Sequence, residues 1–421
     1  MKNKIEESSL PHEDTPKKSK KNQLISAMQP VFILENWYGI FRFHNTDDGL
    51  VPTKKKMKFI SLVVVSAYVI LFTVFLKLPT ITGTGKLVDA MDEVPSIVIL
   101  TQYFLSALRT SFLLSNDNIR LFKSFADLDV KLHIDTNQDF YKKSRKVTVR
   151  FLIIIIVEHV AVSISELLTE NNVIPMNKIV VLPVYLEQTL ELSVFCLMIW
   201  MLTHRLSLIN NYLSKFIEEK DNKHILFLVT DKKTKPEDFN IIGRSSPDNM
   251  KIRDLAVAYD IIGDICGLIN DIFNFQIFMS LVATFTYIVI TIWTSIYIYR
   301  TPGQNDDYDS LVTIIVWCVT AILVVGFMSL ICERLLVTRN DTKILVNKLI
   351  MDYELPKNMR VQAKAFMDLI EAWPLKIFIY DMFTVDISLM LKFISVATTY
   401  LIVIIQITHF LYMAKLEYFK A

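Results

Sequence analysis

The sequence predicts an all-α, polytopic membrane protein with seven transmembrane helices, a cytoplasmic N-terminus, an extracellular C-terminus and a cytoplasmic helical anchor. Three observations predict this fold class. The 421 residues are 52% hydrophobic and only 21% charged, whereas soluble domains average about 25% charged residues. The apolar residues are gathered into seven long blocks, and lysine and arginine are concentrated in alternate gaps between the blocks. We therefore expect a multi-pass protein of the cell membrane, in contact with lipid.

Each apolar block is long enough, or nearly so, to cross a membrane. A bilayer core about 30 Å thick requires about 20 residues of helix. Only helices cross it as separate segments, because every backbone polar group must be paired internally. The second block is the most polar, since it contains Gln102, Ser106 and Arg109. The expected spans are residues 59–79, 95–114, 147–168, 179–201, 277–299, 311–332 and 387–411.

The distribution of positive charge orients these spans. Lysine and arginine number 11, 8, 10 and 8 in residues 1–58, 115–150, 202–276 and 333–385. The three intervening gaps hold one each, and the tail after the last span holds two. Because cytoplasmic flanks carry the excess of these residues, we expect the N-terminus inside the cell and the C-terminus outside.

Three segments outside the spans have helical patterns. Apolar residues from Ile252 to Gln276 recur in steps of three and four, which is a heptad seam that runs into the fifth span. The seam either belongs to an ordinary helix that covers its own chain, or to a cytoplasmic helical collar that also packs between subunits. A weaker pattern covers residues 341–373 and is interrupted at Pro356. Residues 28–43 are aromatic-rich and too short to span, so they suit an amphipathic helix at the inner membrane interface.

The sequence lacks the motifs of the common enzyme classes. It contains no Walker loop, no G-x-G-x-x-G, no H-E-x-x-H and no C-x-x-C. The seven histidines are scattered, and a net charge of +2 gives no bulk attraction to nucleic acid. We therefore expect no enzymatic activity, no cofactor, no metal site and no nucleic-acid partner.

Ionisable and amide groups inside the spans mark a candidate ligand site, because such groups usually face a cavity or a partner. Glu187 and Glu191 share one helix face, where like charges repel, so that face must meet water, a base or a ligand. Aromatic side chains at similar depth add flat apolar surfaces, although tryptophan and tyrosine also gather at membrane interfaces. The candidate ligand-binding residues are Gln102, Tyr103, Glu158, His159, Tyr185, Glu187, Gln188, Glu191, Trp293, Tyr297 and Trp317.

The last span has a different polar pattern. Small and hydroxylated residues from Ser395 to Thr399 precede Tyr400, and Gln406 lies alone in an apolar run. A glutamine in this setting joins helices through hydrogen bonds or lines a pore among hydrophobic constrictions. Physical reasoning on the residues leaves both interpretations open.

The run from Thr399 to Gln406 resembles the signature of insect gustatory receptors, in which Thr-Tyr is followed by five hydrophobic residues and Gln-Phe. Ile407 stands where that family has phenylalanine. The N-terminal segment and the helix that enters the fifth span are similar to the family as well, at Gly39, Phe41, Asn270, Phe273 and Gln276.

The resemblance implies a gustatory (taste) receptor that acts as a ligand-gated, non-selective cation channel. It implies a homo- or hetero-tetramer in which four copies of the last span line one pore for cations. A small-molecule tastant, either a sugar or a bitter compound, would bind an outward-facing pocket in each subunit. Carried over by position, the pore and gate residues are Thr399, Tyr400, Gln406 and Ile407.

The resemblance also implies an organisation of the chain. Residues 1–58 would be a cytoplasmic tail with the interfacial helix 28–43. Residues 59–332 would hold six spans and the ligand-binding region, with a cytoplasmic loop and helix at 202–276. Residues 333–386 would form the anchor helices, and residues 387–421 the pore helix and a short extracellular tail. An odorant-receptor-like channel is the main alternative; a G-protein-coupled receptor would need the opposite orientation, and a secondary transporter would need related halves.

Overall fold

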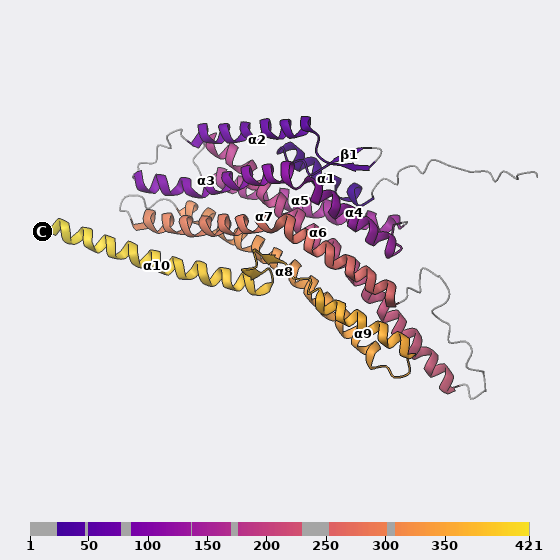
Figure 1. The fold of residues 1–421 in the computed structure, drawn as a ribbon. Coiled ribbons are helices and arrows are strands. Elements are labelled where there is room, and N and C mark those ends of the chain that lie inside the picture. The colour runs from indigo at the N-terminus through magenta and orange to yellow at the C-terminus, as the bar shows by residue number, and fades with distance from the viewer. Residues whose placement is uncertain are drawn as a thin grey trace, which may run out of the picture.

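The structure is a computed structural model that describes residues 23–46, 49–76, 86–135, 137–169, 176–229, 252–300 and 308–420. Within these residues the chain is almost entirely helical, with two small antiparallel hairpins (Figure 1). Seven helices of the described residues are long and apolar enough to cross a membrane, which confirms the predicted all-α, seven-span architecture; the orientation of the termini stays a prediction. They are α2 (Lys55–Leu76), α3 (Lys86–Leu108), α5 (Gln138–Thr169), α6 (Met176–Val229), α7 (Ile252–Arg300), α8 (Tyr308–Met351) and α10 (Ile387–Lys420).

Three of these helices are much longer than a bilayer requires. α6, α7 and α8 contain 54, 49 and 44 residues, whereas about 20 residues cross the apolar core. Their extra turns project from the bundle, as Figure 1 shows, and those of α7 and α8 pack with α9 (Lys357–Ala372). We name this projecting part the anchor. Pro356 caps α9, so the interruption predicted there is confirmed.

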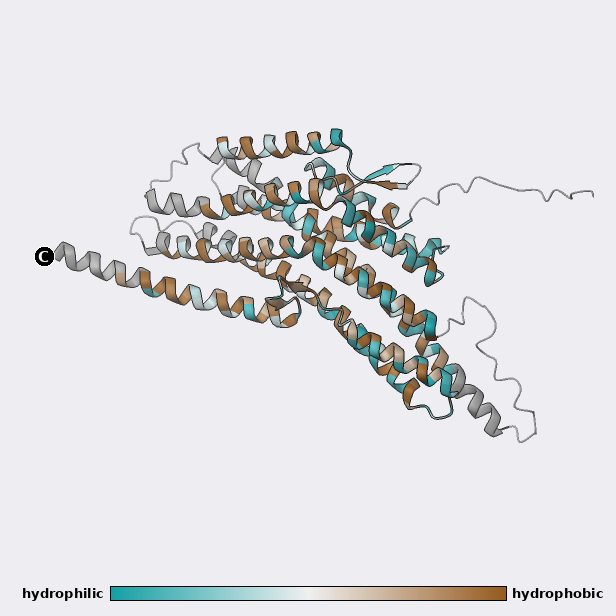
Figure 2. Ribbon diagram, viewed as in Figure 1, coloured by the Kyte–Doolittle hydropathy of each residue, from teal (hydrophilic) through white to brown (hydrophobic). Residues whose placement is uncertain are grey.

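The heptad seam of α7 is packed inside its own chain. The helix α7 contacts α6, α8 and α9. The eight seam residues are all buried, namely Ile252, Leu255, Tyr259, Ile262, Cys266, Ile269, Phe273 and Gln276. The seam therefore covers its own chain, and additional packing between subunits stays a prediction. Hydropathy differs between the spans and the segments outside them. Figure 2 shows hydrophobic residues (brown) along α2, α7 and α10 and more hydrophilic residues (teal) around α4 (Ser115–Lys131) and α9.

The N-terminal helix differs from the predicted one. α1 covers Gln23–Trp37 rather than residues 28–43, and its Leu24, Met28 and Val31 are buried in the main core. The helix ends before Gly39, whose φ of +78° is a left-handed conformation that glycine adopts without strain. α1 is therefore part of the packed bundle, where it contacts α4, α5 and α6. Residues 40–43 lead into the hairpin of β1 (His44–Thr46) and β2 (Gly49–Val51).

The two ends of the helical bundle differ in charge. We name the end that carries α1, α4 and the anchor the basic end, because the lysine-rich starts of α2 and α5 lie there. The C-terminal end of α10 lies at the opposite end of the molecule in Figure 1. This arrangement is the one that an odd number of spans produces.

Candidate functional site

A cavity of about 70 Å³ lies among five of the spanning helices. Its walls come from α3, α5, α6, α7 and α8, so every wall is a helix face and none is a loop. Sites built on helices are held more rigidly than sites on loops. Small-molecule pockets usually measure about 300–1,000 Å³, so the cavity is small and a ligand must displace side chains to enter.

Three aromatic rings form one wall of the cavity. The Tyr185 and Trp317 ring centroids are 5.1 Å apart, those of Tyr287 and Trp317 are 5.6 Å apart, and those of Tyr185 and Tyr287 are 6.0 Å apart. The cluster joins α6, α7 and α8. The indole Nε1 of Trp317 is buried and has no hydrogen-bond partner within the described residues, so it is available to donate to a ligand.

Polar groups face the same space from α5 and from the three helices that carry the rings. Glu158 and His159 come from α5, and Gln188 comes from α6. Hydroxyl groups are added by Thr189, Ser280, Thr284 and Thr320. A small number of polar groups in a mainly apolar and aromatic cavity is the usual composition of a small-molecule site.

Five of the predicted ligand-binding residues line this cavity: Glu158, His159, Tyr185, Gln188 and Trp317. A sixth residue, Gln102, lies behind the wall, where its Nε2 donates a hydrogen bond of 3.0 Å to Ser280 Oγ. Tyr103 is fully buried in a second, smaller core and donates to the Tyr38 carbonyl oxygen at 2.8 Å. The structure therefore gives Gln102 and Tyr103 packing roles beside the cavity.

Glu187 and Glu191 point away from the cavity, on the face of α6 that meets α2, α3 and the segment after α1. Arg42 Nη2 donates to Glu191 Oε2 at 2.7 Å, so the shared acidic face meets a base. Glu187 is 1% exposed, and its carboxylate has no hydrogen-bond partner in the described part of the chain. Trp293 is half-buried elsewhere on α7, and the side chain of Tyr297 lies outside the described residues.

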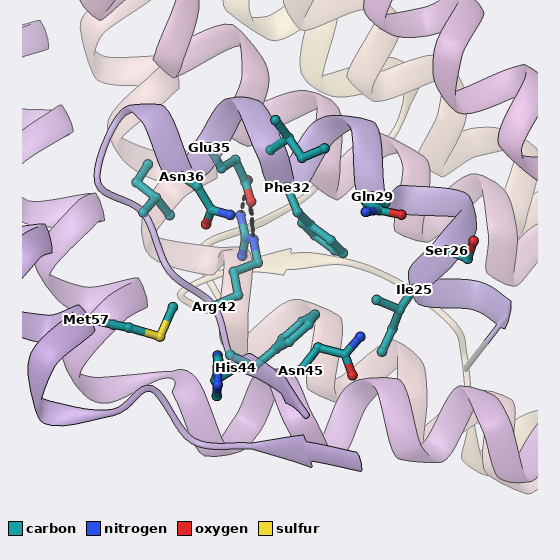
Figure 3. Close-up of a pocket in the computed structure, with 13 residues that line it drawn as sticks. Ile25, Ser26, Gln29, Phe32, Glu35, Asn36, Arg42, His44, Asn45 and Met57 are labelled. Atoms are coloured by element: carbon teal, nitrogen blue, oxygen red, sulfur yellow. Dashed lines mark hydrogen bonds and ion pairs between the residues drawn. The ribbon is translucent and has the colours of Figure 1, made fainter. Parts of the chain in front are cut away.

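Arg42 is the centre of a buried charge cluster that sequence reasoning missed. Its guanidinium donates to Glu35 Oε1 at 2.7 Å and Oε2 at 2.9 Å, and it lies over the Phe273 ring. Burial raises the pKa of Glu35 to about 7, although Arg42 opposes that shift. Figure 3 shows the pair at the base of a second pocket, of about 370 Å³, beneath α1 at the basic end. The cluster joins α1 to α6.

The structure also adds cavity residues that sequence reasoning did not select. Ser280, Thr284 and Tyr287 lie at steps of four and three on α7 and face the cavity together. Such a polar stripe on one face of a spanning helix is a usable signal. It was missed because serine and threonine inside spans also bond their own backbone, as Thr189 does with the Tyr185 carbonyl oxygen.

The predicted pore residues lie on a separate helix. Thr399, Tyr400, Gln406 and Ile407 are all on α10, and all four are exposed in the single chain. The Tyr400 ring meets Phe285 of α7 edge to face at 5.4 Å, and the Thr399 hydroxyl donates to the Ser395 carbonyl oxygen. α10 contacts only α7 and α8 extensively, so most of its surface is unpartnered within the chain.

The sequence profile of a family described as 7tm chemosensory receptor matches residues 29–408. Two solved structures of the insect olfactory receptor OR5 from Machilis hrabei are similar to the chain, one of them in complex with eugenol. Their TM-scores are 0.60 and 0.58, and each is 12% identical in sequence to this chain. Each alignment covers 92% of this chain and 100% of the OR5 chain. At that identity the likeness shows the fold. No curated protein matches the sequence.

Proposed function

Because the chain belongs to the 7tm chemosensory receptor family, we propose that it is a taste receptor that acts as a ligand-gated, non-selective cation channel. The ligand-binding site is the cavity among α3, α5, α6, α7 and α8. The pore is formed by α10 from four subunits, with the N-terminus in the cytosol and the C-terminus outside. Gln406 and Ile407 form the constriction.

The observation that carries this proposal is the position of α7 between the cavity and α10. Thr284 and Tyr287 face the cavity, while the intervening turn presents Phe285 to the Tyr400 ring of α10. A second contact runs through α8, where Gly326 lies against Met390 of α10. A ligand that displaces Tyr287 or Trp317 therefore acts on the two helices that hold α10.

Tetramer formation is supported by apolar surface that the single chain leaves open. Ile407 of α10 is 53% exposed, and the anchor exposes Ile344 (56%) and Val361 (57%) outside the seam that α7 uses. Exposed apolar residues on a projecting, otherwise polar segment are typical of protein–protein contacts. In this arrangement a ligand that binds the open state more tightly shifts a closed–open equilibrium, and the apolar constriction then admits water and cations.

An odorant-receptor-like channel is the second candidate, and the cavity is compatible with it. The three-ring wall and the small volume suit a compact aromatic molecule as well as they suit a polar tastant. The OR5 structure in complex with eugenol concerns a compact phenol. Both candidates share the same site and the same pore.

The test is current recording from cells that express the full chain, in excised patches without ATP or GTP. Sugars, bitter compounds and small phenols are applied in turn. Gln188→Ala is expected to raise the half-maximal ligand concentration about tenfold, the cost of one lost hydrogen bond to a buried group, without changing the reversal potential. Gln406→Ala is expected to change ion selectivity and leave that concentration nearly unaltered.

Matched controls come from the same chain. Glu187 is next to Gln188 but faces away from the cavity, so Glu187→Gln is the first control. Gln138→Ala, which removes an exposed glutamine at the start of α5, is the second. Both should leave sensitivity and selectivity unchanged. Current that appears only with GTP would contradict the channel, and a selectivity change from Gln188→Ala would contradict the separation of site and pore.

A further inference from the structure

An apolar groove, distinct from the ligand cavity and from the pocket beneath α1, lies on the outside of the bundle where α5, α6 and α8 meet. It has a volume of about 510 Å³. Leu197 and Cys196 of α6 form its buried floor, and Phe151 and Phe327 stack across it with ring centroids 5.1 Å apart. We name it the α5–α8 groove. It is separate from the ligand cavity, which opens among other residues of the same helices.

The groove ends in positive charge on the side of the basic end. Arg334 lines it, one helical turn beyond Leu330 on α8. Lys143 precedes Val147 of the groove by four residues on α5, so the two side chains share a helix face. Both cations are exposed, and neither makes an ion pair within the described residues. The neighbouring Glu333 accepts a hydrogen bond from the Ile387 backbone N–H at 3.4 Å, which orients it toward α10.

We propose that the α5–α8 groove binds an anionic glycerophospholipid of the cytoplasmic leaflet. An acyl chain lies along Phe151, Trp200 and Phe327, and the headgroup phosphate pairs with Arg334 and Lys143. Charge complementarity carries the choice of occupant. The groove lies within the spanning segments, so an acyl chain is the apolar molecule available to it. The cytoplasmic leaflet is rich in anionic lipids, and guanidinium groups pair with phosphate in two-point geometry.

The bound lipid would stabilise the contact between the ligand region and the last helix. Arg334 and Glu333 are consecutive on α8, so one turn of helix holds both the headgroup site and the start of α10. Occupation of the groove fixes the position of that turn. The inference goes beyond ligand gating, because it concerns lipid selectivity at a different face of the same helices.

Trp200 lies in the groove and provides a direct probe. Purified full-length protein is placed in phosphatidylcholine nanodiscs that contain a small fraction of lipid with brominated acyl chains, which quench tryptophan on contact. The brominated lipid carries either a phosphatidylglycerol or a phosphatidylcholine headgroup. The Trp200 signal is the fluorescence of the wild type minus that of Trp200→Phe.

Brominated phosphatidylglycerol is expected to quench the Trp200 signal at lower mole fraction than brominated phosphatidylcholine. Arg334→Gln should weaken that preference about fivefold, the value of one cation near an anionic surface. Lys348→Gln makes the same change farther along α8, away from the groove, and should have no effect. If Arg334→Gln does not fold, Lys143→Gln tests the second cation at the charged end of the groove.

Three results would overturn the inference. Equal quenching by the two headgroups would show bulk lipid without selectivity. A headgroup preference that persists in both Arg334→Gln and Lys143→Gln would place the anion elsewhere. Quenching that is the same in the wild type and in Trp200→Phe would show that no acyl chain enters the groove.

Discussion

A single arginine holds three helices together at the basic end. Arg205 of α6 is fully buried, and its Nε and Nη2 donate to the two oxygens of Asp129 of α4 at 2.6 and 2.8 Å. Tyr141 of α5 donates to the same carboxylate at 2.5 Å. The guanidinium also lies over the rings of Phe125 and Phe140. A fully paired, buried ion pair of this kind is costly to break but is not by itself a large source of stability.

Arg205→Met is therefore expected to destabilise the protein by about 3–5 kcal/mol, because it leaves the Asp129 carboxylate buried without its partner. Thermal unfolding in detergent measures the effect. The double variant Asp129→Leu with Arg205→Met should recover a large part of the loss. Lys142→Ala, which breaks an exposed pair with Asp139, should change little. Equal effects of Arg205→Met and Lys142→Ala would show that burial does not govern this pair.

The protonation of Glu35 makes the free energy of unfolding depend on pH. Its folded-state pKa is about 7 against an ordinary value of 4.5, chiefly because of burial. The folded protein therefore binds this proton more tightly than the unfolded chain does. Stability from this group is fully present below about pH 4.5 and is lost as the pH rises through 7, by about 3 kcal/mol in total.

Glu35→Gln cannot titrate at this position. As the pH rises from 5 to 7.5, the unfolding free energy of the wild type should therefore fall relative to that of Glu35→Gln. Denaturant titration of the purified protein at a series of pH values measures this difference. A difference that is independent of pH would show that Arg42 keeps Glu35 ionised throughout that range.

At the scale of elements, one glycine fixes how the anchor meets the spans. A Cβ at Gly263 of α7 would lie 2.4 Å from the Trp373 ring, which is closer than packed atoms allow. Trp373 Nε1 donates to Asp260, and its carbonyl oxygen accepts from Tyr259 and Arg339. Trp373 therefore locks the end of α9 against α7 and α8, immediately before the segment that leads to α10.

Gly263→Ala is expected to destabilise the protein by about 1–3 kcal/mol through overpacking. Gly267, one turn further along α7, provides a matched control, because a Cβ there meets nothing within 4 Å. Gly267→Ala should be neutral or stabilising by up to about 1 kcal/mol, since alanine favours helix over glycine. Unfolding midpoints of the two variants compare the effects, and a larger loss in Gly267→Ala would reverse this account of α7.

The helices themselves were largely predictable, and the errors have physical causes. The blocks of apolar residues located all seven spans, because length and hydropathy are strong signals. The α7 seam was recognised by its spacing, and its residues are buried. The end of α1 was misplaced because the aromatic residues up to Phe43 continue past Gly39, where the backbone turns. The apolar blocks do not mark the ends of α6 and α8, because these blocks indicate where the chain crosses the membrane and not where the helix ends.

At the scale of the whole molecule, the candidate site was predictable only in part. Polar residues inside the spans predict a cavity or a partner, but the sequence does not say which group each of them meets. Gln188 faces the cavity, whereas its neighbour Glu187 does not, and Glu191 faces Arg42 from a segment 149 residues away. Contacts at that separation depend on how the helices pack, and one helix alone contains no information about them.

The proposed tetramer makes a prediction about α10 that belongs to the assembly alone. If four copies of α10 surround one axis, residues at the constriction of neighbouring subunits lie close together. Ile407→Cys should then form intersubunit disulfide bonds under mild oxidation and run as a dimer on a denaturing gel without reductant. The four native cysteines are free and lie on other helices, so the wild type should remain monomeric on that gel.

Val63→Cys is the matched control for this cross-link. Val63 is 50% exposed on α2, close to the 53% of Ile407, but α2 lies on the side of the bundle away from α10. Its cysteine should face lipid and stay reduced. Cross-linking of both variants would show random collision in the membrane. Cross-linking of neither variant would show that the α10 helices of neighbouring subunits do not meet. Cross-linking of Ile407→Cys alone places α10 beside a symmetry axis, as the tetramer requires, because only near such an axis do identical residues of neighbouring subunits meet.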